Sequence, residues 1–310
     1  MISDYIKIAR PDHWFKNMFV FPGVLLGWLA CPPEDFIVAF GHVFVGLVAT
    51  CLICSSNYTI NELLDAPTDR KHPEKKHRPA AAGRIKKSWA YLQWVSLSLS
   101  GLFLARYLGW AFFIVALSLL IMGVVYNVKP LRSKDIPYLD VLTEAINNPI
   151  RLLLGWYAAK CQLTPPASLL LSYWMLGAFF MAVKRYAELR HIGDSIISAA
   201  YRKSFAHYTE DRLLISIVFY SSTFAFFSGV FLIKYRVELI LAIPFYAGFM
   251  SFYIYLGLLP DSPAQHPESL FKHKVFTTYS GIIVVITAIC FFLRVPWLGQ
   301  LFESTIPAGF

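Results

Sequence analysis

The sequence predicts an all-α integral membrane protein, and its composition and its apolar runs carry that prediction. The chain has 310 residues, of which 57% are hydrophobic and only 15% are charged. Its mean hydropathy of +0.53 lies well above that of an ordinary soluble domain. Apolar runs of roughly twenty residues, the length that crosses a bilayer as a helix, recur along the chain. We therefore expect the membrane bilayer as a partner, and no nucleic acid.

Nine segments are expected to span the membrane as helices, in the order 16–31, 36–57, 89–106, 108–126, 140–159, 166–183, 213–233, 237–258 and 275–294. The first is the shortest. The segment from 140 is still favoured as a helix by its length and flanks, although it carries Asp140, Glu144, Pro149 and Arg151. No fixed-period repeat or low-complexity linker interrupts the series, so we expect a single domain over residues 1–310. The N-terminal stretch mixes acids and bases, and no cleaved signal is expected there.

Lys and Arg are distributed unevenly between the two sides of the membrane that this series creates. Most lie in the N-terminal stretch and in the connections 58–88, 127–139, 184–212 and 259–274. The opposite side holds Arg106, Lys160, Lys234, Arg236 and Arg294. Basic residues favour the cytoplasmic side, so we expect the N-terminus in the cytoplasm and the C-terminus outside a bacterial inner (plasma) membrane. The net charge is +9, and we expect at least half of the basic residues to serve this topological bias and the attraction to anionic lipid.

The cysteines lie in or at the ends of apolar segments: Cys31, Cys51, Cys54, Cys161 and Cys290. Metal or redox chemistry would need an accessible thiolate. We therefore expect all of them to be buried packing residues.

The first polar cluster closes the second predicted span. Asn57, Asn61, Asp65 and Asp69 recur every four residues, and four residues advance an α-helix by only about 40° past a full turn, so they form one slanted stripe. Pro67 is expected to kink the helix and to place Asp69 just past the kink or on a following turn, still near Asp65. Converging carboxylates repel one another unless a cation neutralises them. Oxygen ligands suit Mg²⁺ bound together with substrate phosphates, so Asn61, Asp65 and Asp69 are the predicted metal ligands.

Basic residues follow this stripe at once, and they are typical ligands of phosphate oxygens. They are Arg70, Lys71, Lys75, Lys76 and Arg78. Metal, acids and bases together indicate a diphosphate. The alternative is a solvated loop whose acids and bases pair at the surface, where each pair stabilises the protein little.

The stretch Asn61-Glu62-x-x-Asp65-x-x-x-Asp69 resembles the NDxxDxxxD motif of the UbiA superfamily of intramembrane prenyltransferases. The stretch from Arg78-Pro to Gly83 resembles the RP-x-x-x-G that follows it in that superfamily. The resemblance implies a UbiA-like bundle of nine transmembrane helices, with a polar cavity and a Mg²⁺-diphosphate site open to the cytoplasm. Glu62 departs from the pattern, which has Asp at this place.

Three further stretches resemble the decaprenyl-phosphate phosphoribosyltransferase branch: Arg10-Pro-Asp-His-Trp14-Phe-Lys16-Asn17, His72-Pro-Glu-Lys75-Lys-His-Arg78-Pro, and Val183-Lys184-Arg185-Tyr-Ala-Glu188-Leu. The branch implies phosphoribosyl diphosphate as donor and polyprenyl phosphate as acceptor. The expected products are diphosphate and polyprenyl-phosphoryl ribose 5-phosphate, a precursor for cell-envelope sugars.

A second polar cluster, Tyr126-x-x-Lys129 followed by Arg132 and Lys134, resembles the family's Tyr-and-Lys segment and leads to Asp140. Asp140 and Glu144 would share a helix face, and Arg151 would lie about 20° from Asp140 around the helix. A structural Arg–acid pair is one reading. An ionisable residue inside the membrane is nevertheless a functional candidate by default.

The resulting roles are hypotheses for each residue. Asp65, Asp69 and Asp140 are the predicted catalytic residues, with Asp140 binding ribose hydroxyls or stabilising the developing cation. Phosphate clamps are expected at Lys71, Lys75, Arg78 and Lys129, and lipid-phosphate contacts at Lys16, Lys184 or Arg185. The other substrate-binding candidates are Asn17, Asn57, His72, Tyr126, Arg132, Lys134, Arg151 and Glu188. Arg202, Lys203, His207 and Tyr208 are expected at the lipid surface rather than over the pocket.

Two rival functions stay open. A UbiA-type prenyltransferase would alkylate an aromatic acceptor with an isoprenyl diphosphate, using the same Asp65 and Asp69, but it would favour a second aspartate-rich motif. A transporter would place its acids and bases near the membrane midplane in related halves, whereas the clusters here lie at one membrane face. Lipid chain length and oligomeric state have no signature in the sequence.

Overall fold

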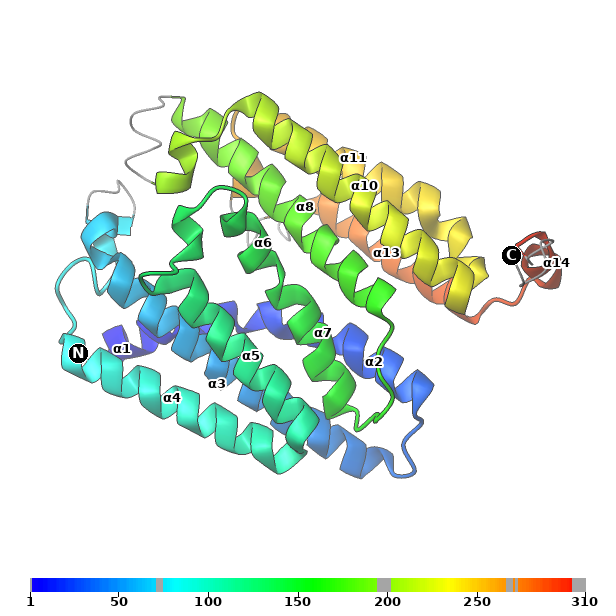
Figure 1. The fold of residues 1–310 in the computed structure, drawn as a ribbon, viewed down its shortest axis with the longest axis horizontal. Coiled ribbons are helices and arrows are strands. Elements are labelled where there is room, and N and C mark those ends of the chain that lie inside the picture. The colour runs from blue at the N-terminus through cyan, green and yellow to red at the C-terminus, as the bar shows by residue number, and fades with distance from the viewer. Residues whose placement is uncertain (1, 71–74, 194–201, 266–269, 271–272, 303–310) are drawn as a thin grey trace. The chain divides into compact units, whose positions relative to one another are not determined.

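The structure, a computed structural model, describes residues 2–70, 75–193, 202–265, 270 and 273–302. All regular structure in these residues is helical, which confirms the predicted fold class. They fall into two compact units (Figure 1): a first unit from 1–165 and 195–207, and a second unit from 166–194 and 208–310. The single domain expected from the sequence stays a prediction.

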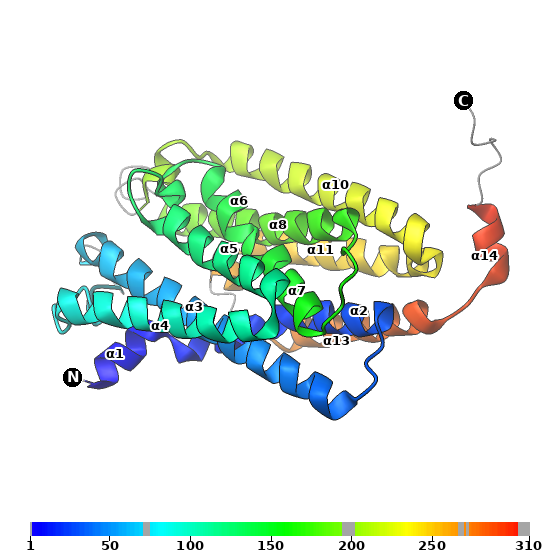
Figure 2. The same ribbon diagram turned by 60° about the horizontal axis from the view of Figure 1, so that its bottom comes forward.

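The first unit holds the N-terminal helices and a short turn from the 195–207 segment. Its elements are α1 (Ile2–Ala9), η1 (Pro11–Val20), α2 (Phe21–Ala30), α3 (Phe36–Asp69), η2 (Lys75–His77), α4 (Lys87–Leu108), α5 (Trp110–Asn127), η3 (Ser133–Asp135), α6 (Leu139–Ala145), α7 (Asn147–Ala158) and η4 (Lys203–Ala206). Helix α3 packs along α4 and α5, and α7 packs against α2 and α5 (Figures 1 and 2). Helices α3 and α5 therefore bring their polar ends, residues 57–69 and 126–127, together.

Glycines let two backbones approach closely inside the first unit. A Cβ atom on Gly23 would lie 1.9 Å from the carbonyl oxygen of Leu152, and one on Gly155 would lie 1.9 Å from the carbonyl oxygen of Val20. Small residues at such crossings are typical of helix packing in membranes. The glycines thus fix how α7 lies against η1 and α2.

The second unit is built around a long helix pair. Its elements are α8 (Ala167–Ile192), α10 (Glu210–Tyr235), η5 (Val237–Ala242), α11 (Ile243–Leu258), η6 (Pro263–Gln265), α13 (Lys274–Phe292) and α14 (Pro296–Leu301). Helix α8 packs against α10 and α11. Aromatic rings fill the contact between α8 and α11, where the centroids of Phe180 and Tyr253 lie 4.7 Å apart.

Helices occupy all nine segments predicted to span the membrane, but three of those segments are divided between two elements. The segment 16–31 is η1 followed by α2, 140–159 is divided at Ile146 into α6 and α7, and 237–258 is η5 followed by α11. Six helical segments of the described chain are long and apolar enough to cross a bilayer: Phe36–Asp69, Trp110–Asn127, Ala167–Ile192, Glu210–Tyr235, Val237–Leu258 and Lys274–Phe292. The chain is an integral membrane protein, and the count of nine spans stays a prediction.

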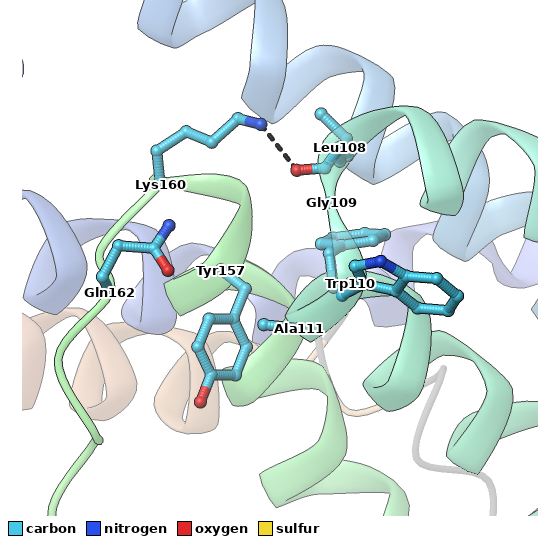
Figure 3. Close-up of a pocket in the computed structure, with 8 residues that line it drawn as sticks. Leu108, Gly109, Trp110, Ala111, Tyr157, Lys160 and Gln162 are labelled. Atoms are coloured by element: carbon cyan, nitrogen blue, oxygen red, sulfur yellow. Dashed lines mark hydrogen bonds between the residues drawn. The ribbon is translucent and has the colours of Figure 1, made fainter.

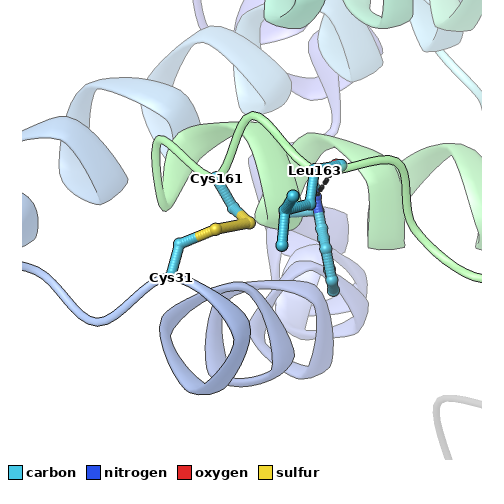
Figure 4. Close-up of a disulfide and its surroundings, with 4 residues drawn as sticks. Cys31, Cys161 and Leu163 are labelled. Atoms are coloured by element: carbon cyan, nitrogen blue, oxygen red, sulfur yellow. Dashed lines mark hydrogen bonds between the residues drawn. A yellow bond between two sulfur atoms is a disulfide. The ribbon is translucent and has the colours of Figure 1, made fainter.

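A disulfide joins Cys31, just after α2, to Cys161, just after α7, with Cα atoms 5.3 Å apart (Figure 4). The expectation that every cysteine only packs was wrong for this pair. A sequence separation of 130 residues leaves no local signal of such pairing. Cys51, Cys54 and Cys290 are buried and free, as expected.

Candidate functional site

One pocket of the first unit gathers many of the polar residues predicted from the sequence. It has a volume of about 290 Å³ and lies between the end of α3, the connection from α5 to α6, and the residues at η4. The described residues that line it are Leu64, Asp65, Pro67, Thr68, Asp69, Lys75, Lys129, Arg132, Lys134, Asp135, Arg202 and Lys203. Six of these side chains are cationic and three are carboxylates. A concave wall with this excess of positive charge attracts anions.

Helix α3 carries both predicted metal carboxylates into the pocket. Helix α3 continues through Pro67 and ends at Asp69, so Asp69 is part of the helix and not of a following turn, while the kink itself stays a prediction. The N–H group that proline lacks would serve only the last turn of the helix, so its loss removes one hydrogen bond near an end that frays in any case. Asp65 and Asp69 therefore lie one helical turn apart on the same wall.

Cations already neutralise both carboxylates. Asp65 Oδ1 accepts hydrogen bonds from Lys134 Nζ at 2.6 Å and from Arg132 Nη2 at 2.9 Å. Asp69 Oδ2 accepts one from Arg78 Nη1 at 2.8 Å. Charge-assisted hydrogen bonds of this kind are strong. They hold three cations beside the two carboxylates.

Lys134 is the most deeply buried of these cations, with 6% of the residue exposed. Burial lowers its pKa to about 8, while the nearby Asp65 carboxylate acts in the opposite direction. Its ammonium group also lies 5.8 Å from the centre of the Tyr126 ring, within the range of a cation–π contact. Lys129, the lysine expected from the sequence to clamp phosphate, lies exposed at the pocket.

Asn127 is a site residue that the sequence analysis missed. Its Oδ1 accepts hydrogen bonds from Lys134 Nζ at 2.8 Å and from Asn61 Nδ2. Its own Nδ2 donates to the carbonyl of Gly123 at 2.8 Å, which fixes the orientation of the amide. The available signal was its position, directly after Tyr126 at the end of an otherwise apolar helix. Asn127 thus connects α3 to the lysine that holds Asp65.

Asn57, the first member of the predicted stripe, is packed against α5. Its Nδ2 donates to the carbonyl of Leu119 at 3.0 Å. Its Oδ1 is buried and has no hydrogen-bond partner among the described residues. A Cβ atom on Gly123 would lie 2.1 Å from this oxygen, so glycine is required there. Asn57 therefore helps to seat α3 on α5, behind the pocket wall.

The donor atoms at the pocket fit Mg²⁺. No three His, Cys, Asp or Glu side chains converge as a metal-ligand group in the described part of the chain. Two carboxylates that share a wall with cationic side chains are a set that Mg²⁺ uses when substrate oxygens and water complete its shell. Asn61 is held by Asn127 instead of lining the pocket.

The loop after α3 is folded back on that helix. Glu62 is buried, and its Oε1 accepts a hydrogen bond from the Ala80 amide at 3.2 Å. Arg70 Nε donates to the Ala81 carbonyl at 3.0 Å, and Gly83 closes the turn with φ of +73°. These contacts hold Arg78 against Asp69. The side chain of Glu62 thus fixes the loop through its hydrogen bond with the Ala80 amide.

Asp140 is fully buried and anchors the residues at η4. It accepts hydrogen bonds from Ser204 Oγ at 3.2 Å and from Arg202 Nη1 at 3.4 Å. Lys203 Nζ lies 3.8 Å from Asp135 Oδ2. The expectation that Arg202 and Lys203 sit at the lipid surface was wrong, because both line the pocket. Asp140 itself does not line it.

A second polar cluster lies inside the first unit, away from the pocket lining. Arg151 Nε donates to Asn17 Oδ1 at 3.2 Å, and Arg151 Nη2 lies 3.8 Å from Cys54 Sγ. Lys16 Nζ lies 3.1 Å from His13 Nδ1. The break at Ile146 places Asp140 and Arg151 on different helices, so their predicted alignment along one helix does not hold.

The remaining predicted residues lie elsewhere. Arg185 and Lys184 in α8 of the second unit bind Glu188 in the same helix, at 2.7 and 3.8 Å. Lys71 and His72 lie outside the described residues. Lys75 lines the pocket, as expected for a phosphate ligand.

A smaller pocket, of about 140 Å³, lies at the opposite end of α4 and α5 (Figure 3). Its one cationic lining residue, Lys160, donates to the Leu108 carbonyl at 2.6 Å, and no carboxylate of the described chain lines it. The paired acids and bases are thus concentrated at the other end of the first unit.

Comparison with known proteins places this fold and site in a family. Residues 18–280 match the model of the UbiA prenyltransferase family. The decaprenyl-phosphate phosphoribosyltransferase of Mycolicibacterium smegmatis is 31% identical over 217 residues, which cover 69% of this chain and 65% of that protein. The enzyme of the same name from Mycobacterium tuberculosis strain H37Rv is 30% identical over 213 residues, covering 69% of this chain and 68% of that protein.

A solved structure has the same fold. The UbiA homolog from Archaeoglobus fulgidus bound to DMAPP and Mg²⁺ is 20% identical, with a TM-score of 0.69, and the match covers 96% of this chain and 99% of that one. Together with the aspartates at the end of α3 and the all-helical membrane fold, these matches establish the family. The chain belongs to the UbiA prenyltransferase family.

Proposed function

We propose that this chain transfers the 5-phosphoribosyl group from phosphoribosyl diphosphate to a polyprenyl phosphate and releases diphosphate. The observation that carries the proposal is the pocket itself, which is lined by six cations, by the two carboxylates at the end of α3 and by Asp135 of η3. The relatives named decaprenyl-phosphate phosphoribosyltransferase support the choice of donor and acceptor. The products are diphosphate and polyprenyl-phosphoryl ribose 5-phosphate, which suits cell-envelope biosynthesis.

Asp65 and Asp69 would hold Mg²⁺ together with oxygens of the donor's diphosphate. The ion supplies Lewis-acid charge to the leaving group when it is bound. The Archaeoglobus fulgidus homolog, whose structure is described as bound to DMAPP and Mg²⁺, supports this assignment. Asn61 contributes through Asn127 in the proposed arrangement, because its amide is directed to that residue.

Protein cations complete the stabilisation of the leaving group. Arg78, Arg132 and Lys134 bind the two carboxylates; in the substrate complex they would bind phosphate oxygens, and Asp65 and Asp69 would hold the divalent ion. Lys75 and Lys129 bind from the rim of the pocket. Departure of diphosphate leaves an oxocarbenium-like ribose, so prearranged positive charge at the departing oxygen lowers the barrier.

The acceptor needs little activation. A phosphate group is already anionic at neutral pH, so its oxygen can attack the anomeric carbon without a strong general base. The proposed contact of the lipid phosphate is Lys16 or, as alternatives in the second unit, Lys184 or Arg185. Asn17 and Arg151, which are hydrogen-bonded to each other, are proposed to border the acceptor's path.

The proposed orientation places the pocket at the cytoplasmic face. The Cys31–Cys161 disulfide supports it, because it lies where the positive-inside rule puts the outer ends of the helices. Disulfides persist in oxidising compartments and are rare in the cytosol. The active site would thus face the cytoplasm, which supplies phosphoribosyl diphosphate.

The alternative is a UbiA-type enzyme that alkylates an aromatic acceptor with an isoprenyl diphosphate. Asp65 and Asp69 would serve that donor equally well. The discriminating experiment supplies purified protein with Mg²⁺, polyprenyl phosphate and phosphoribosyl diphosphate, and measures diphosphate release and ribosylated lipid. The proposal predicts both products, and their loss in Asp65→Asn and Asp69→Asn. Turnover of an isoprenyl diphosphate with an aromatic acid, and none with phosphoribosyl diphosphate, would favour the alternative.

A further inference from the structure

Some cationic residues of the pocket do not pair with the α3 carboxylates Asp65 and Asp69. Arg78, Arg132 and Lys134 bind Asp65 or Asp69 directly. Arg202 and Lys203 enter from a different element, at the start of η4. Lys203 keeps 72% of its side chain exposed, and its ion-pair distance to Asp135 is a loose 3.8 Å. The pocket therefore has a second cationic group beside the one that serves a diphosphate.

A buried pair fixes that second group in place. Asp140 is 0% exposed, and its carboxylate accepts from the equally buried Ser204 hydroxyl and from Arg202. A carboxylate withdrawn from water needs such partners, and leaving it without them is costly. The buried Phe205 side chain adds packing on the same segment. The hydrogen bonds to Asp140 and the packing of Phe205 thus hold Arg202 and Lys203 at the pocket.

The two candidate donors differ in the anionic group that such a wall would recognise. An isoprenyl diphosphate carries one charged group and an apolar tail. Phosphoribosyl diphosphate carries the diphosphate on one ribose carbon and a phosphate monoester on another, so its two anionic groups need two sets of cations. Arg and Lys are the residues that bind phosphate oxygens most strongly.

We propose that Arg202 and Lys203 bind the phosphate monoester of the donor, and that Asp140 and Ser204 are positioning residues that hold them there. This inference rests on the proposed pentosyl donor and deepens it. Arg202 and Lys203, which we call the η4 wall, would then be the part of the site that selects a sugar donor over an isoprenyl donor. Asp140 acts through Arg202 and Ser204, without touching the substrate.

The test measures binding to the full-length protein in detergent, with Mg²⁺ present, by titration calorimetry. The ligands are phosphoribosyl diphosphate, inorganic diphosphate and dimethylallyl diphosphate. The variants are Lys203→Gln, Arg202→Gln and the double variant, with Lys87→Gln as a control that removes an exposed charge from the start of α4, outside the pocket lining. Lys203 is exposed, so its variant is expected to fold normally.

The wild type should bind phosphoribosyl diphosphate more tightly than inorganic diphosphate. Lys203→Gln should weaken the binding of phosphoribosyl diphosphate about fivefold, and the double variant about fiftyfold. The affinities for inorganic diphosphate and dimethylallyl diphosphate should stay within about twofold of the wild type. Ser204→Ala keeps both cations and should weaken only the sugar donor, by about threefold to tenfold. Lys87→Gln should bind all three ligands as the wild type does.

Each other outcome overturns a defined part of the reasoning. If the double variant keeps the wild-type preference for phosphoribosyl diphosphate, the η4 wall does not bind the monoester, although the proposed function stands. If the variant loses affinity for all three ligands equally, these cations serve the diphosphate and the inference is wrong. If the wild type binds phosphoribosyl diphosphate no more tightly than inorganic diphosphate, the proposed donor is itself wrong.

Discussion

Replacing Lys134 by Gln tests whether the buried lysine, and not the exposed one, stabilises the leaving group. Lys134 Nζ makes hydrogen bonds of 2.6 Å to Asp65 and 2.8 Å to Asn127, and only 6% of the residue is exposed. Lys129 lines the same pocket but lies in solvent. Because a prearranged donor in a site of low dielectric is worth far more than a solvated one, the two lysines should differ strongly.

The expected magnitudes follow from these contacts. Removal of one prearranged donor to a developing anion lowers kcat by about 100-fold to 1,000-fold, so Lys134→Gln should lose activity on that scale. Lys129→Gln should lose less than about tenfold, as expected for an exposed charge. Stability should fall by only about 1–3 kcal/mol in Lys134→Gln, because Arg132 still neutralises Asp65 and Gln can still bond Asn127.

The assay is diphosphate release under saturating donor and acceptor, with thermal unfolding of each variant measured beside it. Lys129→Arg and Lys134→Arg serve as charge-preserving controls. If Lys129→Gln is the more damaging substitution, or if Lys134→Gln keeps activity within about threefold of the wild type, the assignment of the leaving-group cation from burial is refuted.

Three further predictions concern the elements that support the site. Asn127→Ala removes the acceptor shared by Lys134 and Asn61; it should cost about 1–3 kcal/mol of stability and lower kcat more than it changes KM, and an unchanged kcat would exclude a positioning role. Gly155→Ala places a Cβ 1.9 Å from a backbone oxygen, so a loss of about 2 kcal/mol or more in unfolding experiments is expected, and a wild-type melting curve would contradict the close crossing. Chelation of divalent metal should abolish diphosphate release and added Mg²⁺ should restore it; turnover in chelator would exclude a metal role.

The disulfide supplies a prediction about orientation as well as stability. Reduction of Cys31–Cys161 should lower stability by about 2–4 kcal/mol, while diphosphate binding at the other end of the helices stays intact. In sealed right-side-out vesicles, a membrane-impermeant thiol reagent applied outside after reduction should label the pair. Labelling only from the inner side would reverse the proposed topology.

Local sequence patterns predicted the parts of the site that lie on one helix. The four-residue spacing from Asn57 to Asp69 placed Asp65 and Asp69 on a common wall, and the pocket confirms that they share it. The sequence left open a turn after Pro67, whereas α3 continues to Asp69, because a missing N–H group in the last helical turn costs too little to end the helix.

Contacts between distant segments were beyond local patterns. The partner of Asp140 comes from residues 202–204, and the partner of Cys31 lies 130 residues away. Neither pairing leaves a periodic signal, since it depends on how helices and connections pack. Asn127 escaped notice for the same reason, because its importance comes from two partners on other elements.

The sequence contains a signal for the break between α6 and α7, namely Pro149, but the surrounding residues are mostly apolar and made that signal easy to overlook. Pro149 is the third residue of α7, a position in the first helical turn where the lack of an N–H group removes no intrahelical bond. The run before it could thus have been read as the start of a new helix. Segment length alone favoured one continuous span.

The most direct measurement uses Mn²⁺ in place of Mg²⁺, since both take oxygen ligands, and records its coupling to ³¹P by electron–nuclear double resonance with inorganic diphosphate bound. If Asp65 and Asp69 hold the divalent ion against a diphosphate, the wild type should show ³¹P coupling, and Asp65→Asn and Asp69→Asn should each lose the bound ion and the coupling together. Wild-type ion affinity and wild-type ³¹P coupling in both variants would contradict that claim.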